Sequence, residues 1–93
     1  MIKSFRCRET ERIYRREVSR RFPPDIQQRA FVQLNALDAA TQLDDLRLPP
    51  SNRLEALRGD RKGQWSIRIN DRWRVCFRWR EGHAEQVEVV DYH

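Results

Sequence analysis

The residues best suited to chemistry are arginines around two alternating strands and two side chains at the end of the chain. Arg58, Arg68 and Arg74 are placed to bind an anion, because arginine grips phosphate through a planar fork of donors. Tyr92 and His93 close the sequence, and a histidine can give or accept a proton near neutral pH. This set suits the cleavage of RNA, in which the 2′-hydroxyl attacks the adjacent phosphate.

Such a cleavage needs a base for the hydroxyl, positive charge for the phosphorane and an acid for the leaving 5′-oxygen. It needs no metal ion or other cofactor, and no spacing of Cys and His in this sequence indicates a metal site. Tyr92 is the best candidate for stacking on a base, and His93 for the acid. The residues alone leave two alternatives open: His93 as a frayed terminus, and the arginines as a solvated sheet face.

The positive charge is concentrated in one part of the chain. The formal net charge is +5, and nine basic residues against three acidic ones give residues 53–80 a charge of +6, leaving −1 for the rest. The basic residues of this segment are Arg53, Arg58, Arg61, Lys62, Arg68, Arg72, Arg74, Arg78 and Arg80. A localised basic surface on a small protein fits nucleic acid best among large anions.

The length and composition indicate one domain over residues 1–93, large enough for a modest core. Charged residues make up 35% of the chain but both signs are mixed, so a disordered chain is not expected. No apolar run suits a signal peptide or a membrane span. Cys7 and Cys76 fit free thiols in the reducing cytoplasm, with a disulfide between them as the alternative.

The elements expected to position these residues follow the order β-α-α-β-β-β-β. A first strand is expected at 2–6, a helix at 9–21 with Ile13, Tyr14 and Val18 buried, and a second helix from 24 to about 40. The second helix carries an apolar stripe with spacings of 4, 4 and 3, formed by Ile26, Ala30, Leu34 and Leu37. Strands are expected at 54–57, 64–69, 73–80 and 84–91, with turns at 58–63 and 81–83. His83 is expected to be an exposed turn residue.

Strand parity predicts the register of the two hairpins, because paired residues must send their apolar side chains to the same face. A three-residue loop at 70–72 pairs Ile67 with Val75 and sets Arg68 opposite Arg74. A three-residue turn at 81–83 pairs Val75 with Val89. The same register pairs Ile69 with Trp73 and Phe77 with Val87, and it places Tyr92 beside Arg72 on the basic face and Asp91 on the other.

Three stretches resemble the HigB toxins of the RelE-like superfamily. They are the opening MIKSF, the segment LEALRGDRKGQWSIRINDRWRVCF from position 54 and the ending VVDYH. The resemblance implies an α+β, RelE-like compact fold with two N-terminal helices packed on a twisted, mainly antiparallel sheet. It implies a ribosome-dependent endoribonuclease that cuts mRNA and stops translation. It also implies a HigA-like helix-turn-helix antitoxin, through which the complex would bind operator DNA.

The resemblance also assigns residues to the site, and the prediction for the chain end then favours function. It places the catalytic group at Arg58, Arg74, Asp91, Tyr92 and His93. Further phosphate contacts are expected from Arg61, Lys62, Arg68 and Arg72. Some relatives carry lysine where this chain has Arg58, and arginine is a poor proton shuttle. Arg58 therefore suits charge stabilisation, while the general base stays open.

Two other functions use the same basic face. The first is a nucleic-acid-binding module without catalysis, which predicts salt-dependent binding and no cleaved product. The second is a structural partner that docks an acidic peptide, which predicts that charge reversal at Arg68 abolishes a protein complex and leaves RNA unaffected.

Overall fold

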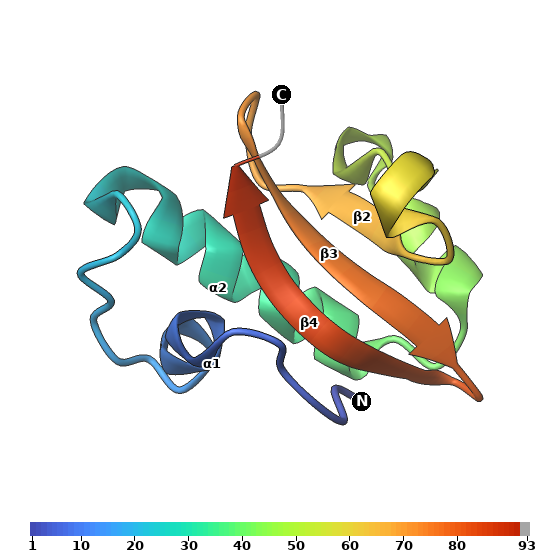
Figure 1. Cartoon of the computed structure of the whole chain (residues 1–93), viewed down its shortest axis with the longest axis horizontal. Coiled ribbons are helices and arrows are strands. Elements are labelled where there is room, and N and C mark those ends of the chain that lie inside the picture. The colour runs from blue at the N-terminus through green and yellow to red at the C-terminus, as the bar shows by residue number, and fades with distance from the viewer. Residues whose placement is uncertain (92–93) are drawn as a thin grey trace.

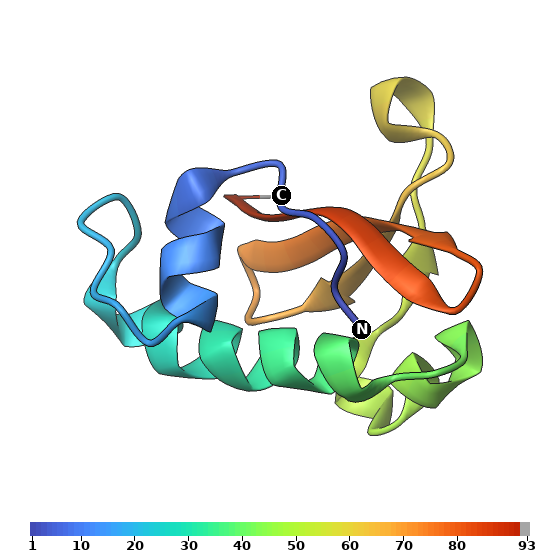
Figure 2. The ribbon, with the colours of Figure 1, turned by 90° about the horizontal axis from the view of Figure 1, so that it is seen from below.

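The structure, a computed structural model, describes residues 1–91. Figures 1 and 2 show a layer of helices on one face of a twisted four-stranded antiparallel sheet. The helices are α1 (Arg8–Tyr14) and α2 (Pro24–Ala39), and the strands, in spatial order, are β1 (Glu55–Ala56), β2 (Trp65–Arg68), β3 (Trp73–Arg80) and β4 (His83–Asp91). Short 3-10 helices are η1 (Leu43–Arg47), η2 (Pro50–Asn52) and η3 (Gly59–Arg61). The predicted α+β class is confirmed.

The first expected strand is replaced by two isolated bridges. Ile2 and Phe5 pair in parallel with Ala84 and Val87 of β4, so the segment follows β4 without forming a regular strand. Between the two bridges, the backbone N–H of Gln86 donates to the side chain of Ser4 at 2.9 Å rather than to a backbone carbonyl. The prediction of a strand at 2–6 was therefore wrong, although its position along the last strand fits the expected element order.

Helix α1 ends seven residues before the predicted limit. Arg16 adopts a left-handed conformation with φ of 62°, and the N–H groups of Arg16 and Glu17 donate back to the carbonyls of Ile13 and Arg12. This is a Schellman cap, which usually carries glycine at the left-handed position. The chain then leaves the core, and Val18, expected to be buried, is 79% exposed.

Helix α2 confirms its prediction closely. Its apolar stripe, formed by Ile26, Ala30, Leu34 and Leu37, is buried. The stripe packs in one core with the odd-numbered residues of the sheet, among them Ile67, Val75 and Phe77. Trp65, Trp73 and Trp79 pack around the margin of this core. The sheet face opposite α2 therefore carries the even-numbered residues, which include Arg68 and Arg74.

The β2–β3 hairpin has the predicted register, with Ile67 opposite Val75 and Arg68 opposite Arg74. The Asn70 side chain accepts hydrogen bonds from the backbone N–H groups of Arg72 and Trp73, both at 2.9 Å, and so shapes the three-residue loop. An odd loop keeps both apolar sets on the core side, as the parity argument requires.

The β3–β4 hairpin differs from the prediction near its turn. Arg80 pairs with His83, so the turn has two residues, Glu81 and Gly82, both with positive φ. The ladder shifts register between Cys76 and Arg78, so the predicted pairing of Phe77 with Val87 is not part of it, while Val75 still faces Val89 as predicted. A bulge in β4, where Gln86 has a φ of 53°, absorbs the difference.

His83 begins β4 and is half-buried, which corrects its expected place in an exposed turn. Its Nδ1 atom is buried without a hydrogen-bond partner among residues 1–91. Cys7 and Cys76 are both free thiols, which decides against the disulfide. None of the helices in the described part of the chain is long and apolar enough to cross a membrane.

Candidate functional site

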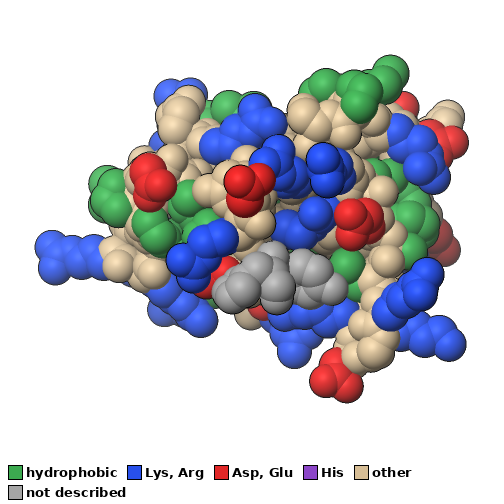
Figure 3. Space-filling view, turned by 90° about the horizontal axis from the view of Figure 1, so that it is seen from above, with side chains coloured by type: hydrophobic (Ala, Val, Ile, Leu, Met, Phe, Trp, Pro, Cys, Tyr) green, Lys and Arg blue, Asp and Glu red, His purple; other side chains and the backbone are tan. Residues whose placement is uncertain are grey.

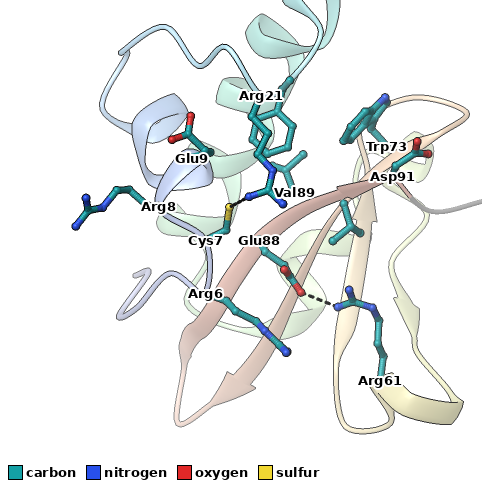
Figure 4. Close-up of a pocket in the computed structure, with 12 residues that line it drawn as sticks. Arg6, Cys7, Arg8, Glu9, Arg21, Arg61, Trp73, Glu88, Val89 and Asp91 are labelled. Carbon is teal, nitrogen blue, oxygen red and sulfur yellow. Dashed lines mark hydrogen bonds and ion pairs between the residues drawn. The ribbon is translucent and has the colours of Figure 1, made fainter.

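The segment that contains η3 projects from the edge of the sheet on the side opposite α2 (Figure 2). Arg61 reaches across the sheet from this segment, and its Nη1 lies 2.8 Å from Glu88 Oε1 on β4 (Figure 4). The same Nη1 lies 3.1 Å from Gln64 Oε1. Glu88 lies three residues before the end of β4. The ion pair therefore ties the turn at 58–63 to the C-terminal half of the last strand, two strands away in the sheet.

Arg74 is buried on the sheet face opposite α2, so the alternative of a solvated sheet face does not hold for this residue. Its side chain is 10% exposed. Its Nε donates to Ser66 Oγ at 2.8 Å, and its Nη2 donates to the backbone carbonyl of Arg53 at 2.6 Å. Glu55 Oε1 lies 3.8 Å from Nη1. Arg74 thus joins β2, β3 and the chain entering β1.

Arg68, opposite Arg74, has a separate partner. Its guanidinium is bound to the exposed carboxylate of Asp71 in the hairpin loop. Because each arginine has its own acceptor, the two positive charges do not face each other uncompensated. Cys76 lies on the same sheet face and is fully buried, and this burial raises the pKa of its thiol to about 11. The thiol is therefore protonated at neutral pH and unsuited to act as a nucleophile.

Arg58 is exposed immediately before η3, at the end of an open hollow of about 540 Å³ that it shares with Glu55, Ala56 and Leu57. Gly59 follows with φ of 63°, a left-handed conformation that glycine adopts without a steric penalty. Among the described residues, no carboxylate lies within 4 Å of the charged groups of Arg58 or Lys62. These two cations are available to an anion from outside.

Asp91 closes β4 and is joined to Arg72. Arg72 Nη2 lies 2.6 Å from Asp91 Oδ2, and Nε lies 3.4 Å from Oδ1. The carboxylate raises the pKa of the Arg72 guanidinium above its usual value. The predicted residues Tyr92 and His93 follow directly in the sequence and lie outside the described residues.

An open pocket of about 770 Å³ lies between the start of α1 and the end of β4 (Figure 4). Arg6, Arg8 and Arg21 line it together with Arg61 and Asp91. None of these three N-terminal arginines is among the site residues predicted from the sequence. Their signal was the expected N-terminal strand, because a segment that lies along the last strand brings its arginines to that strand's end.

Figure 3 looks onto the end of the molecule where β4 finishes. Lys and Arg side chains gather across much of this face, with a smaller number of Asp and Glu side chains between them. The arrangement therefore combines exposed cations on both sides of β4 with arginines that hold the scaffold together. Such a surface can bind a polyanion and stabilise additional negative charge on a phosphate.

Comparisons with known proteins agree on one family. Residues 3–93 match the family of HigB-like toxins, described as RelE-like toxins of the type II toxin–antitoxin system HigB. Toxin HigB-1 of Vibrio cholerae serotype O1 is 40% identical over 85 residues, 90% of each chain. Endoribonuclease HigB of Proteus vulgaris is 33% identical over 93 residues, which is all of both chains.

The fold is similar to that of YafQ from E. coli. The crystal structure of a YafQ point mutant aligns with a TM-score of 0.64 over 98% of this chain and 93% of YafQ, at 11% identity. At that identity the likeness concerns the fold alone. The family match and the two relatives together show that this chain belongs to the HigB family of RelE-like toxins of type II toxin–antitoxin systems.

Proposed function

We propose that this chain is the toxin of its system and acts as a ribosome-dependent endoribonuclease that cuts mRNA and arrests translation. The relative from Proteus vulgaris, named an endoribonuclease, aligns over its whole length. The observation that carries the proposal is the Arg61–Glu88 ion pair at 2.8 Å. It ties the turn bearing Arg58 to the strand that leads into Tyr92 and His93.

The proposed reaction is attack of an RNA 2′-oxygen on the adjacent phosphorus, with loss of the 5′-oxygen. The new bond joins the 2′-oxygen to phosphorus while the bond from phosphorus to the 5′-oxygen breaks, leaving a cyclic phosphate and a 5′-hydroxyl. Arg58 stabilises the additional charge on the phosphorane, His93 protonates the leaving oxygen, and Tyr92 stacks on a base. The base that removes the 2′-proton is not assigned to a residue.

The contacts of Arg74 favour a positioning role over a direct grip on the phosphate. Two of its donor atoms already bind Ser66 and the Arg53 carbonyl. These bonds hold the chain that leads through β1 to Arg58. Asp91 holds Arg72 and so fixes the end of β4 next to the terminal residues. Lys62, Arg61, Arg68 and Arg72 supply further positive charge around the substrate.

The partner follows from the family, since a type II toxin is paired with an antitoxin protein. The finer proposal is a HigA-like antitoxin with a helix-turn-helix domain, through which the complex binds operator DNA. The ribosome and its mRNA are the proposed targets, and translation places the protein in the cytoplasm. A small helix-turn-helix reading frame beside the toxin gene would support this partner.

The proposal is tested by primer extension on ribosomes programmed with a defined message. We expect wild-type protein to cut the message, and Arg58→Ala or His93→Ala to lower the cleavage rate about 10²–10³-fold. Arg29→Ala, which removes an exposed charge from α2, serves as the matched control and should cleave normally. Uncut message despite tight RNA binding would favour the non-catalytic module, and full cleavage by the Arg58→Ala, His93→Ala double variant would contradict the assigned residues.

A further inference from the structure

We propose that the pocket between α1 and β4 is a second RNA-binding subsite, in which Arg6 and Arg21 each contact a backbone phosphate of the message next to the scissile one. The ligand is single-stranded RNA, recognised through phosphate and one base. The inference rests on the proposed function, because the subsite is defined relative to a bound message. It adds residues from the N-terminal third of the chain to those that the resemblance assigns.

The charges of the pocket support an anionic ligand. Three acidic side chains line it, and each is already bound to an arginine: Glu9 to Arg12 at 3.3 Å, Glu88 to Arg61 at 2.8 Å and Asp91 to Arg72 at 2.6 Å. The carboxylates are thus neutralised by partners that the structure already provides. The remaining arginines of the lining, Arg6, Arg8 and Arg21, therefore contribute positive charge that no acid of the pocket offsets.

Arg6 and Arg21 are the residues placed to use this charge. Figure 4 shows the Arg21 guanidinium between α1 and β4 beside Cys7, the Arg6 side chain extending past Glu88 and away from α1, and Arg8 pointing away from the pocket. Among residues 1–91, no carboxylate lies within 4 Å of either group. Arg21 Nη1 contacts only the weak acceptor Cys7 Sγ, at 3.6 Å. A phosphate that binds either guanidinium would therefore displace no ion pair.

An aromatic wall gives the pocket a surface for a base. Trp73 lines it and is held edge-on by buried Phe22, with ring centroids 5.6 Å apart and planes at 89°. The volume of about 770 Å³ lies within the range of roughly 300–1,000 Å³ typical of ligand pockets. A fixed aromatic ring and arginines without ion pairs in one pocket are the combination that binds single-stranded nucleic acid through stacking and phosphate contacts.

The position of the pocket favours RNA over an acidic protein segment. Asp91 belongs to its lining and immediately precedes the proposed Tyr92 and His93. Arg61 also lines it and comes from the turn that carries Arg58. A strand bound at the catalytic residues therefore enters this pocket with its neighbouring nucleotide. An acidic peptide of a partner would use the arginines but has no need of the aromatic wall.

The test measures binding of a labelled single-stranded RNA of about ten nucleotides, within the usual range of binding-site sizes. We expect Arg6→Ala, Arg21→Ala together to weaken binding about tenfold. The slope of log K against log salt should fall by about 1.4, for two lost phosphate contacts. Arg6→Lys, Arg21→Lys should keep most of the slope. The matched control Arg29→Ala, Arg80→Ala removes two exposed charges outside the pocket and should keep both affinity and slope.

Three results would overturn the subsite: unchanged RNA affinity in the Arg6, Arg21 alanine pair, an equal loss in the control pair, or loss of the antitoxin complex with RNA affinity retained.

A second experiment distinguishes binding to the message from binding to ribosomal RNA by using ribosomes that carry a message ending before the A site. The alanine pair should bind these ribosomes like wild type and lose affinity only on extended messages, and an equal loss on both would contradict a message subsite. If wild-type protein binds RNA as expected but cuts nothing on programmed ribosomes, the proposed function fails while the subsite stands.

Discussion

Replacing Arg74 with methionine tests whether this arginine joins the scaffold or binds substrate. Methionine preserves much of the apolar stem and removes the guanidinium. The change leaves Ser66 Oγ and the Arg53 carbonyl without donors that now lie at 2.8 and 2.6 Å. A hydrogen bond to a charged group contributes about 1.5–3 kcal/mol. Water can reach part of the exposed Arg53 region, so we expect the free energy of unfolding to fall by about 3 kcal/mol in total.

The assay is urea unfolding followed by tryptophan fluorescence, because Trp65, Trp73 and Trp79 pack against the core. In a separate thermal unfolding experiment, the melting temperature of Arg74→Met should fall by about 12–24 °C, because a domain of this size loses about 4–8 °C per kcal/mol. Ser66→Ala should cost about 1 kcal/mol. Together with Arg74→Met it should cost less than the sum of the two, because both variants remove the same bond.

Cleavage distinguishes a positioning role from direct contact. If Arg74 acts by holding the chain that carries Arg58, then Arg74→Met should lower the cleavage rate in wild-type protein and have little further effect in the Arg58→Ala variant. Arg74→Lys, which can still donate to one of the two acceptors, should recover part of both stability and rate. Two results would refute a positioning role and favour direct phosphate binding by Arg74. The first is a free energy of unfolding of Arg74→Met within about 0.5 kcal/mol of wild type, and the second is full additivity of the effects of Arg74→Met and Arg58→Ala on the cleavage rate.

Two further perturbations address the surface of the fold. Arg61→Ala releases the turn at 58–63 from Glu88, so it should destabilise the protein by about 1 kcal/mol and speed protease cutting within this turn. Arg80→Ala is the control. Unchanged protection of the turn in Arg61→Ala would contradict a stabilising role of the Arg61–Glu88 ion pair. Asp45 accepts hydrogen bonds from the backbone N–H groups of Thr41 and Gln42, which lower its pKa. Its stabilising effect is therefore present above the ordinary aspartate pKa of about 3.9 and is lost as the pH falls through the lower pKa of the folded state. The difference in unfolding free energy between wild type and Asp45→Asn should therefore disappear in acid. A difference that stays constant with pH would refute this role of Asp45.

The sequence predicts well those elements in which only one conformation and register buries all the apolar side chains. In α2, the spacing of Ile26, Ala30, Leu34 and Leu37 admits a helix with one buried face. In the β2–β3 hairpin, a shift of one residue would send Ile67 and its neighbours into solvent. The hydrophobic pattern therefore determines the register before any turn chemistry is considered.

Two of the errors fall where a residue other than glycine adopts a left-handed backbone. Arg16 ends α1 and Gln86 forms the bulge of β4, with φ of 62° and 53°, and neither residue type signals such a conformation. The β3–β4 prediction shows the limit of parity clearly. Parity predicts that Val75 pairs with Val89. It does not say whether the one residue that has no partner lies in the turn or in a bulge of the strand. The structure places it at the bulge.

The sequence predicts which residue types make up the site, but it does not predict which acceptor each arginine binds. Composition indicates how many arginines a segment carries, while the acceptors that engage them come from distant positions, as Glu88 does for Arg61 and the Arg53 carbonyl for Arg74. An expected phosphate ligand and a scaffold arginine are therefore indistinguishable in the sequence. The resemblance supplied the catalytic candidates, and the contacts divide the candidates within residues 1–91 into those that hold the fold and those with unengaged charge.

That division has a consequence for the path of the RNA. Arg61, Arg68, Arg72 and Arg74 each hold an acceptor within the protein, so these four arginines contribute little unengaged charge. Of the cations within residues 1–91 that we propose for RNA binding, Arg58 and Lys62 lie in the turn on one side of β4, and Arg6 and Arg21 lie on the other. A strand attracted to both sets must cross the end of β4. It would then pass Asp91 and the residues that follow it, where the leaving oxygen needs its proton.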